Sequence, residues 1–231
     1  MPSLASIEQE QLDPSFKGFP LDRPPFTVAQ AGHQQMNLLR GDLPFPCAIL
    51  REHALDHNSR WYASFARELG IDFAPHGKTT MAPQIFSRQL RDGAWGITVG
   101  TVQQAWIALD AGVRNVLMAN QIASPGEAQR WLSMMERYKE ARLISLLDSK
   151  AQFDMLCKAA KDWAESKGWL APPFEVLVEL GRTGGRTGCR SLDDALALTL
   201  RAQQEAAFRV VGVEAYEGLA ATGDSTKDHA M

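Results

Sequence analysis

One short segment of the sequence holds residues whose types and spacing suit carbonyl chemistry. The run FAPHGKTT at 73–80 places Lys78 two positions after His76 and directly before Thr79. A lysine at the end of a buried strand loses part of its solvation, and the resulting neutral amine can attack an aldehyde to form a Schiff base. We therefore predict that Lys78 is a nucleophile and that His76 and Thr79 are catalytic neighbours that position it or a substrate. For His76, a hydrogen-bonded core histidine is the alternative.

Two other patterns resemble known sites but lack residues that those sites require. The GKT at 77–79 matches the end of a phosphate-binding Walker A loop, but Asp72 stands where that loop needs its first glycine. His53 and His57 are four residues apart on an expected helix, yet the glutamate and third ligand of a zinc protease motif are missing. The sequence therefore predicts neither a nucleotide loop nor a metal site here.

From Cys47 onward, short apolar runs alternate with longer stretches that carry apolar residues every three or four positions. The short runs predict strands at 47–50, 71–76, 96–100, 115–120, 143–148, 174–180 and 210–216. The longer stretches predict helices at 54–69, 82–92, 101–112, 125–138, 150–167 and 191–206, with one further short helix near 27–40. Trp61 with Phe65, and Met134 with Met135, are expected to be ordinary helix packing faces. Strict alternation predicts the α/β class, because only crossover helices connect neighbouring parallel strands.

Polar residues recur at the ends of successive expected strands, and their distribution favours a closed sheet. These residues are His76, Asn120 with Gln121, Asp148 and Tyr216. A barrel gathers all its strand ends around one mouth, whereas an open doubly wound sheet uses mainly those at its switch point. The G-x-G-x-x-G turn of dinucleotide-binding sheets is also missing after the first strand. We therefore expect part of a (β/α)8 TIM barrel, with Asn120 and Gln121 at its mouth.

Composition narrows the class of protein and its partners. The chain has 231 residues, of which 45% are hydrophobic and 22% charged, as in globular proteins. A net charge of −3 lacks the basic excess that nucleic acid or an anionic membrane surface would attract. Its three cysteines form no CxxC pair, and the sequence shows neither a signal-peptide pattern nor a membrane-spanning apolar run. We expect a cytoplasmic protein that binds neither nucleic acid nor membranes.

Four motifs together resemble one known family. They are PHGKTT at 75–80, GAWGITVGTVQQAWIALDAG with NVLMANQI between 93 and 122, VELGRTGGRTGCR at 178–190 and VVGVEAYEG at 210–218. Their order and spacing are similar to those of the fold-type III pyridoxal-phosphate enzymes, whose barrel is of the alanine racemase N-terminal type. Within that superfamily the chain resembles the D-serine dehydratase and D-threonine aldolase group, especially amino-acid deaminases and D-serine dehydratase-like proteins. The resemblance extends from Pro46 to Gly218.

The resemblance implies pyridoxal 5'-phosphate as the cofactor and a role for each matching residue. Lys78 matches the lysine that holds the cofactor as a Schiff base. Arg186 matches the arginine near the cofactor ring, where a guanidinium tunes how much negative charge the ring absorbs. Because GRTG occurs twice between 181 and 188, Arg182 is the alternative to Arg186. Tyr216 matches the tyrosine of a Tyr-x-Gly motif that faces the cofactor. Asn120 and Gln121 end a strand and are expected to hydrogen-bond the cofactor or the substrate carboxylate.

The chain departs from the family pattern because it supplies only about six of the eight strands of a barrel. We divide it into an N-terminal arm at 1–45, a cofactor-binding barrel at 46–218 and a polar tail at 219–231. The strand that follows the arm is expected to join a β domain that is missing here. The last two strands, their phosphate loop, and the His and Cys that bind zinc in many relatives are missing as well. We therefore expect a truncated chain, in which any zinc would be bound by residues outside it.

For the intact protein, the resemblance implies a lyase that dehydrates and deaminates a β-hydroxy D-amino acid to a 2-oxo acid and ammonia. D-serine and D-threonine are the expected substrates, and a homodimer is the expected assembly. Retro-aldol cleavage of D-threonine and a non-catalytic pyridoxal-phosphate-binding role remain alternatives, because the same barrel motifs serve all three. We do not assume that the 231 residues are active alone.

Overall fold

The computed structural model describes residues 4–216 and 218, and its centre is a five-stranded parallel sheet. The strands are β3 (Ile97–Val99), β4 (Asn115–Gln121), β5 (Arg142–Leu147), β6 (Phe174–Leu180) and β7 (Phe208–Ala215). The helices around them are α2 (Glu52–Leu69), α3 (Pro83–Arg91), α4 (Val102–Asp110), α5 (Pro125–Arg137), α6 (Lys150–Lys167) and α7 (Leu192–Gln204). Helices and strands alternate along the chain, which confirms the predicted α/β class.

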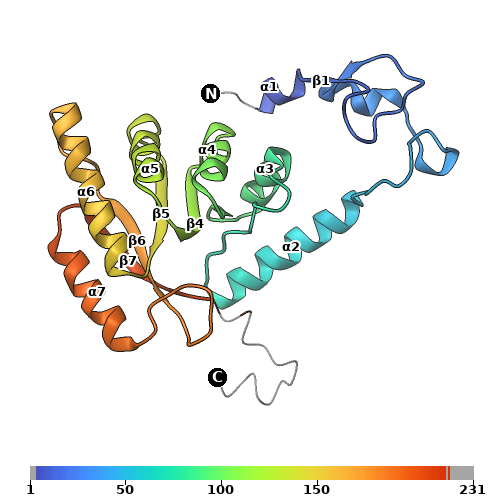
Figure 1. Cartoon of the computed structure of the whole chain (residues 1–231). Helices are drawn as coiled ribbons and strands as arrows, with labels where there is room; N and C mark the ends of the chain where they lie inside the picture. The colour runs from blue at the N-terminus through green and yellow to red at the C-terminus, as the bar shows by residue number, and fades with distance from the viewer. Residues whose placement is uncertain (1–3, 217, 219–231) are drawn as a thin grey trace.

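The order of the strands distinguishes a barrel from an open doubly wound sheet. Each strand pairs in parallel with the next one along the chain, so the sheet order β3-β4-β5-β6-β7 has no point of reversal. A doubly wound sheet reverses its order at a switch point, whereas a barrel adds strands in one direction. Helices α3 to α6 lie along an arc outside the curved sheet (Figure 1). The described residues therefore form part of a TIM barrel.

The segment that carries Lys78 extends this sheet beyond β3. The amide of Trp95 donates to the carbonyl of Phe73 over 2.9 Å, and the amide of Gly77 donates to the carbonyl of Thr98 over 2.7 Å. The segment forms one isolated parallel bridge, His76 with Thr98, rather than the regular strand expected at 71–76. It nevertheless occupies a sixth strand position beside β3.

The prediction of a strand at 47–50 is wrong, since Cys47 to Leu50 have no regular secondary structure. These residues are exposed, and Leu50 keeps 70% of its surface accessible. A β-strand needs a partner strand to satisfy its amide and carbonyl groups, and none of the described residues pairs with this segment.

The core lies between the sheet and the apolar faces of its helices. Trp131, Leu156 and Phe174 are fully buried there. Phe153 of α6 stacks on Phe208 of β7, with ring centroids 4.9 Å apart. Helices α5 and α7 begin directly after Ser124 and Ser191, whose side chains accept hydrogen bonds from amides in the first turn. Within residues 4–216 and 218, no helix has the length and apolar character that a membrane span needs.

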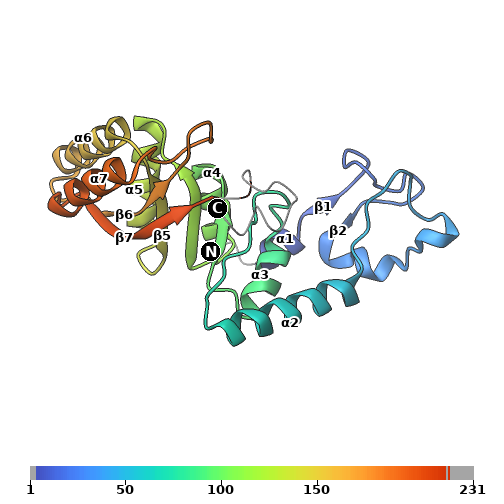
Figure 2. The same ribbon diagram turned by 90° about the horizontal axis from the view of Figure 1, so that it is seen from below.

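The N-terminal arm continues from the far end of α2 and turns back toward α3 (Figures 1 and 2). It contains α1 (Leu4–Glu8) and a small antiparallel pair, β1 (Gln11–Leu12) with β2 (Phe26–Thr27). The single helix expected near 27–40 is instead two 3-10 helices, Val28–Gln34 and Leu38–Arg40. Phe19 and Phe26 stack with centroids 5.2 Å apart and form the small core of this arm. The predicted tail at 219–231 lies outside the described residues.

Two apolar faces remain exposed, one near each end of the sheet. On α2, Trp61 is 58% and Phe65 41% exposed, so the prediction that they pack ordinarily in a core is wrong. The two rings stack on each other, 5.3 Å apart. On α7, beside the edge strand β7, the exposed leucines recur every four residues at Leu192, Leu196 and Leu200. The prediction that Met134 and Met135 form a packing face is confirmed, because Met134 is fully buried and Met135 packs against the core.

Candidate functional site

A cavity of about 360 Å³ opens at the carboxyl ends of the parallel strands. Its walls include Gly100, Thr101, Asn120, Gln121, Asp148 and Thr187. These residues follow or end β3, β4 and β5, or belong to the loop after β6. The volume lies in the range of roughly 300–1,000 Å³ that is usual for small-molecule sites. The strand ends therefore meet around one site, as the barrel interpretation predicted.

Lys78 is placed at this mouth by the residue before it. Gly77 is buried, and an added Cβ there would lie 2.6 Å from Cε1 of Phe86 and 2.8 Å from Cγ2 of Ile97. Glycine thus lets the backbone pack directly on the core before the chain turns outward. The Lys78 side chain passes Gly100 in the cavity wall, where an added Cβ would lie 3.4 Å from Cδ of the lysine. Lys78 and Thr79 are both exposed.

His76 is oriented by the backbone of β3. Its Nδ1 lies 3.3 Å from the carbonyl oxygen of Thr98. A carbonyl only accepts hydrogen bonds, so Nδ1 carries the proton and Nε2 of the neutral ring is left as a proton acceptor. Burial, and then the charge of Lys78, lower the pKa of His76 below its usual range, although the bond to Thr98 opposes them. The neutral, basic form of His76 is therefore favoured near neutral pH.

Asn120 and Gln121, at the end of β4, both line the cavity but differ in their contacts. Asn120 Nδ2 donates to the carbonyl of Gly100 over 3.0 Å. Gln121 Nε2 donates to Oδ2 of Asp148 over 3.1 Å and also contacts Oε2 of Glu179. Its Oε1 is buried and has no hydrogen-bond partner among the described residues. Buried acceptors in proteins usually have a hydrogen-bond donor, so this oxygen is free to accept a hydrogen bond.

Arg186 and Tyr216 come together from different loops. The guanidinium carbon of Arg186 lies 4.7 Å from the centroid of the Tyr216 ring. Both side chains are exposed, and neither is among the residues that line the cavity. Arg186 is followed directly by the cavity residue Thr187, so the pair lies beside the mouth. Arg182, in the first copy of the repeat, is also exposed.

Sequence reasoning missed three residues that support this site, Asp148, Glu179 and Arg190. Asp148 was noticed as a strand-end residue but given no role, although its Oδ2 accepts the amide of Gly188 over 2.9 Å. Glu179 is only 4% exposed, within β6. The available signal was a glutamate in an apolar strand, two residues before a glycine-rich loop. For Arg190 the signal was the four-residue spacing of Arg182, Arg186 and Arg190.

The described residues fit pyridoxal phosphate, the cofactor implied by the sequence resemblance. The stem of Lys78 lies beside Gly100 in the cavity wall, although Lys78 is not itself among the lining residues, and its primary amine is the group that covalent attachment of an aldehyde requires. Gln121 lines this cavity, and its buried Oε1 has no hydrogen-bond partner among the described residues. No group of three or more His, Cys, Asp or Glu side chains that could hold a metal ion occurs in the described part of the chain.

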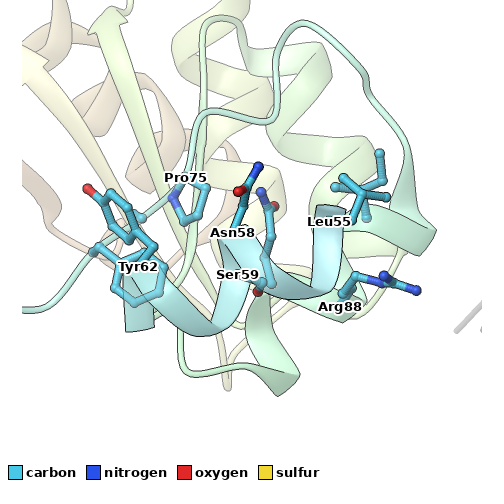
Figure 3. Close-up of a pocket in the computed structure, with 10 residues that line it drawn as sticks. Leu55, Asn58, Ser59, Tyr62, Pro75 and Arg88 are labelled. Carbon is cyan, nitrogen blue, oxygen red and sulfur yellow. The ribbon is translucent and has the colours of Figure 1, made fainter. Parts of the chain in front are cut away.

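A second cavity, of about 400 Å³, lies between α2, α3 and residues 73–75 (Figure 3). Leu55, Tyr62 and Pro75 are among the residues that line it (Figure 3), and its walls are mainly apolar. Arg88 lines it as well but is paired with Asp56 over 2.7 Å. None of the predicted site residues lines this cavity, so we attribute no catalytic chemistry to it.

Comparisons with known proteins bear on this site. No protein-family model matches the chain. It is 27% identical over 177 residues to D-threo-3-hydroxyaspartate dehydratase of Delftia sp. strain HT23, covering 76% of this chain and 44% of that enzyme. It is 26% identical over 175 residues to D-threonine aldolase of Arthrobacter sp., covering 75% and 43%. The chain thus spans about half the length of the curated relatives it matches.

Solved structures agree with the sequence matches. The crystal structure of D-threonine aldolase from Filomicrobium marinum matches with a TM-score of 0.72 at 27% identity, covering 82% of this chain and 48% of that one. Alanine racemase from E. faecalis matches with a TM-score of 0.58 at 16% identity, covering 75% and 44%, and supports the fold alone. The chain is therefore a homologue of D-threo-3-hydroxyaspartate dehydratase and D-threonine aldolase, with the barrel fold of the fold-type III pyridoxal-phosphate enzymes.

Proposed function

We propose that this chain is the cofactor-binding part of a pyridoxal-phosphate-dependent lyase that acts on β-hydroxy D-amino acids. D-serine and D-threonine are the candidate substrates, and dehydration with release of ammonia and a 2-oxo acid is the candidate reaction. The observation that supports this most is the position of Lys78, which follows a strand position and lies against Gly100 in the wall of the mouth cavity. The names of the homologues support the same class of substrate, since they act on 3-hydroxyaspartate or threonine.

In this proposal, Lys78 has two tasks at its Nζ atom. It first holds the cofactor covalently, and after exchange with the substrate amine it takes the proton from the substrate α-carbon. Bound pyridoxal phosphate supplies the electron sink that makes this α-proton acidic. The lysine stem packs beside Gly100, since a Cβ there would lie 3.4 Å from its Cδ, an ordinary contact distance. Gln121, which lines the cavity, is proposed to hydrogen-bond the cofactor or the substrate.

His76 is proposed to hold or move a proton next to Lys78. Its Nδ1 proton is fixed on the Thr98 carbonyl, which leaves Nε2 to accept a proton. The low pKa of His76 keeps the ring neutral beside the lysine. An uncharged ring at this place does not repel a positive charge on its neighbour Lys78.

Borohydride trapping tests the central assignment. We incubate the chain with pyridoxal phosphate, reduce it with borohydride and map the labelled peptide by mass spectrometry. The label is expected on the peptide that contains Lys78, and K78R, which keeps the charge but is a poor nucleophile, is expected to remain unlabelled. Labelling of Lys139 or Lys150 in place of Lys78, or no labelling, would show that the proposal is wrong.

The choice between dehydratase and aldolase needs a separate experiment, because the matched relatives include both. The protein with bound cofactor is given D-threonine, and its products are quantified. Dehydration yields a 2-oxo acid and ammonia, whereas retro-aldol cleavage yields glycine and an aldehyde. We expect the 2-oxo acid; glycine as the main product would reassign the reaction without changing the role of Lys78.

A further inference from the structure

Two acidic side chains lie beneath the glycine-rich loop that carries Arg186. Glu179 belongs to β6 and is 4% exposed, and Asp148 follows the end of β5. The Nε2 of Gln121, from the end of β4, donates to both carboxylates. Three neighbouring strands therefore contribute one polar cluster, which we call the 121/148/179 cluster.

This cluster binds the loop directly on the carboxyl side of Arg186. The Thr187 hydroxyl donates to Oε1 of Glu179 over 2.7 Å, and the Gly188 amide donates to Oδ2 of Asp148 over 2.9 Å. The Cys189 amide donates to the main-chain carbonyl of Glu179 over 2.8 Å. The residues that follow Arg186 are thus anchored to the strand ends.

Arg190 stabilises the backbone of the loop between residues 182 and 187 by hydrogen bonds. Its guanidinium donates to the main-chain carbonyls of Arg182, Gly185, Arg186 and Thr187, at 2.8–3.3 Å. The loop is also tightly closed, because a Cβ added at Gly181 would lie 2.2 Å from the carbonyl oxygen of Thr187. Arg186 therefore projects from a backbone that is fixed on both sides.

The burial of Glu179 is costly and calls for a physical reason. A carboxylate removed from water loses much of its hydration, which only good hydrogen bonds or an opposite charge can offset. The carboxylate of Glu179 accepts from the Thr187 hydroxyl and contacts the Gln121 amide, and within the described residues it forms no ion pair. An apolar residue would fill this place in β6 at lower cost, so the carboxylate has a use beyond packing.

We propose that Glu179 is a positioning residue. Through the hydroxyl of Thr187 it holds the loop that carries Arg186 in a fixed position beside the cavity, and so increases the affinity for pyridoxal phosphate. The effect on cofactor affinity rests on the proposed function, whereas the effect on the order of the loop does not. Thr187 lines the cavity itself, so the hydrogen bond to Glu179 connects the buried strand to the site wall. Removing this hydroxyl should loosen the loop and displace Arg186 without unfolding the barrel.

The repeated GRTG sequence provides a matched control. Thr187 in the second copy donates to Glu179, whereas Thr183 in the first copy is exposed and forms no such bond within the described residues. We therefore compare T187V, T187S and T183V in the full chain. Valine has nearly the shape of threonine without the hydroxyl, and serine keeps the hydroxyl.

Two readouts follow the loop and the ligand separately. Trypsin cleavage after Arg186 is timed by mass spectrometry without cofactor, and the Kd for pyridoxal phosphate is measured by absorbance titration. T187V is expected to be cleaved faster after Arg186 and to bind the cofactor on the order of tenfold more weakly, the effect of one lost hydrogen bond to a charged group. T187S should restore both values and T183V should change neither, while thermal unfolding stays close to that of the unmodified chain.

The outcomes separate this inference from the proposed function. Unchanged cleavage after Arg186 in T187V would overturn the inference whatever the cofactor does. Faster cleavage with an unchanged Kd would overturn it as well, since the loop would then be ordered without serving the ligand. Equal effects of T183V and T187V would show that the bond to Glu179 is not the cause. If the unmodified chain carries no label on Lys78, the proposed function fails, and the cleavage experiment still decides whether Glu179 orders the loop.

Discussion

The guanidinium carbon of Arg186 lies 4.7 Å from the centroid of the Tyr216 ring, a cation–π contact between the loop after β6 and the end of β7. Thirty positions separate the two residues, yet neighbouring parallel strands bring their motifs together. Such a contact is worth about 0.5–1 kcal/mol at an exposed site. It is therefore a weak contribution to stability, and its greater effect is to orient both side chains beside the mouth cavity.

The first prediction concerns Arg186. R186L should change the unfolding free energy by no more than about 1 kcal/mol, because the side chain is exposed and its ring contact is weak. It should, however, shift the absorbance maximum of bound pyridoxal phosphate and weaken its binding, because a positive charge beside the cofactor is lost. Absorbance titration and thermal unfolding measure the two effects.

R182L is the control for that prediction, because it removes the same side chain from the first copy of the repeat. It should have much less effect on the cofactor spectrum. The reverse order of effects would mean that Arg182, rather than Arg186, serves the cofactor.

The second prediction concerns the titration of His76. Burial and the charge of Lys78 lower its pKa, so the ring binds its proton less readily in the folded chain than in the unfolded one. The associated stability is present above the usual histidine pKa of about 6.5 and declines as the pH falls below that value toward the lower, folded pKa. Proton NMR of the histidine ring, assigned with H76Q, should show a midpoint below the usual value.

K78M provides a check on the physical cause. Removing the positive charge of Lys78 should raise the pKa of His76, because the lysine contributes to the lowering. A midpoint that stays the same in K78M would leave burial as the sole cause.

The third prediction concerns the close packing beneath Lys78. G77A should destabilise the fold by about 1–3 kcal/mol, because its Cβ would overlap the buried rings and methyl groups of Phe86 and Ile97. It should also weaken cofactor binding, since the backbone before Lys78 must move. Chemical denaturation gives the free energy, and F86L in the same chain should recover part of the loss by making space.

G32A is the matched control, because a Cβ at Gly32 has no atom within 4 Å and its backbone is not left-handed. It should change the unfolding free energy by less than about 0.5 kcal/mol. An equal loss in both variants would point to glycine flexibility rather than to overlap with Phe86.

The fourth prediction concerns the apolar face of α7. Because no described residue covers Leu196, which is 58% exposed, we expect the chain to self-associate and L196E to increase its solubility with little change in melting temperature. L198E is the control two residues away, since Leu198 is 7% exposed and a buried charge there should unfold the helix from the sheet. Light scattering and thermal unfolding distinguish them, and a monodisperse, monomeric unmodified chain would contradict the prediction.

Local sequence determined most of the secondary structure. Alternating apolar runs and amphipathic stretches predicted β3 to β7 and α2 to α7 to within a few residues, because side-chain periodicity reports directly on which face is buried. Helix starts at Ser124 and Ser191 were predictable as well, since a capping side chain acts on amides only two or three residues away. The motif around Lys78 was recognisable for the same reason, as its residues are contiguous.

Tertiary structure decided what depends on partners far away in the chain. The residues at 47–50 have the side chains of a strand, but no described strand pairs with them. Trp61 and Phe65 have the spacing of a helix packing face, but no described residue buries them. Periodicity shows which residues share a face, but it does not show what packs against that face. The contact of Glu179 with Gln121 spans 58 positions and that of Asp148 with Gly188 spans 40, so neither pair leaves a local pattern in the sequence. Only the parallel order of the strands places their ends around one cavity, and it is this order that makes a buried glutamate part of the candidate site.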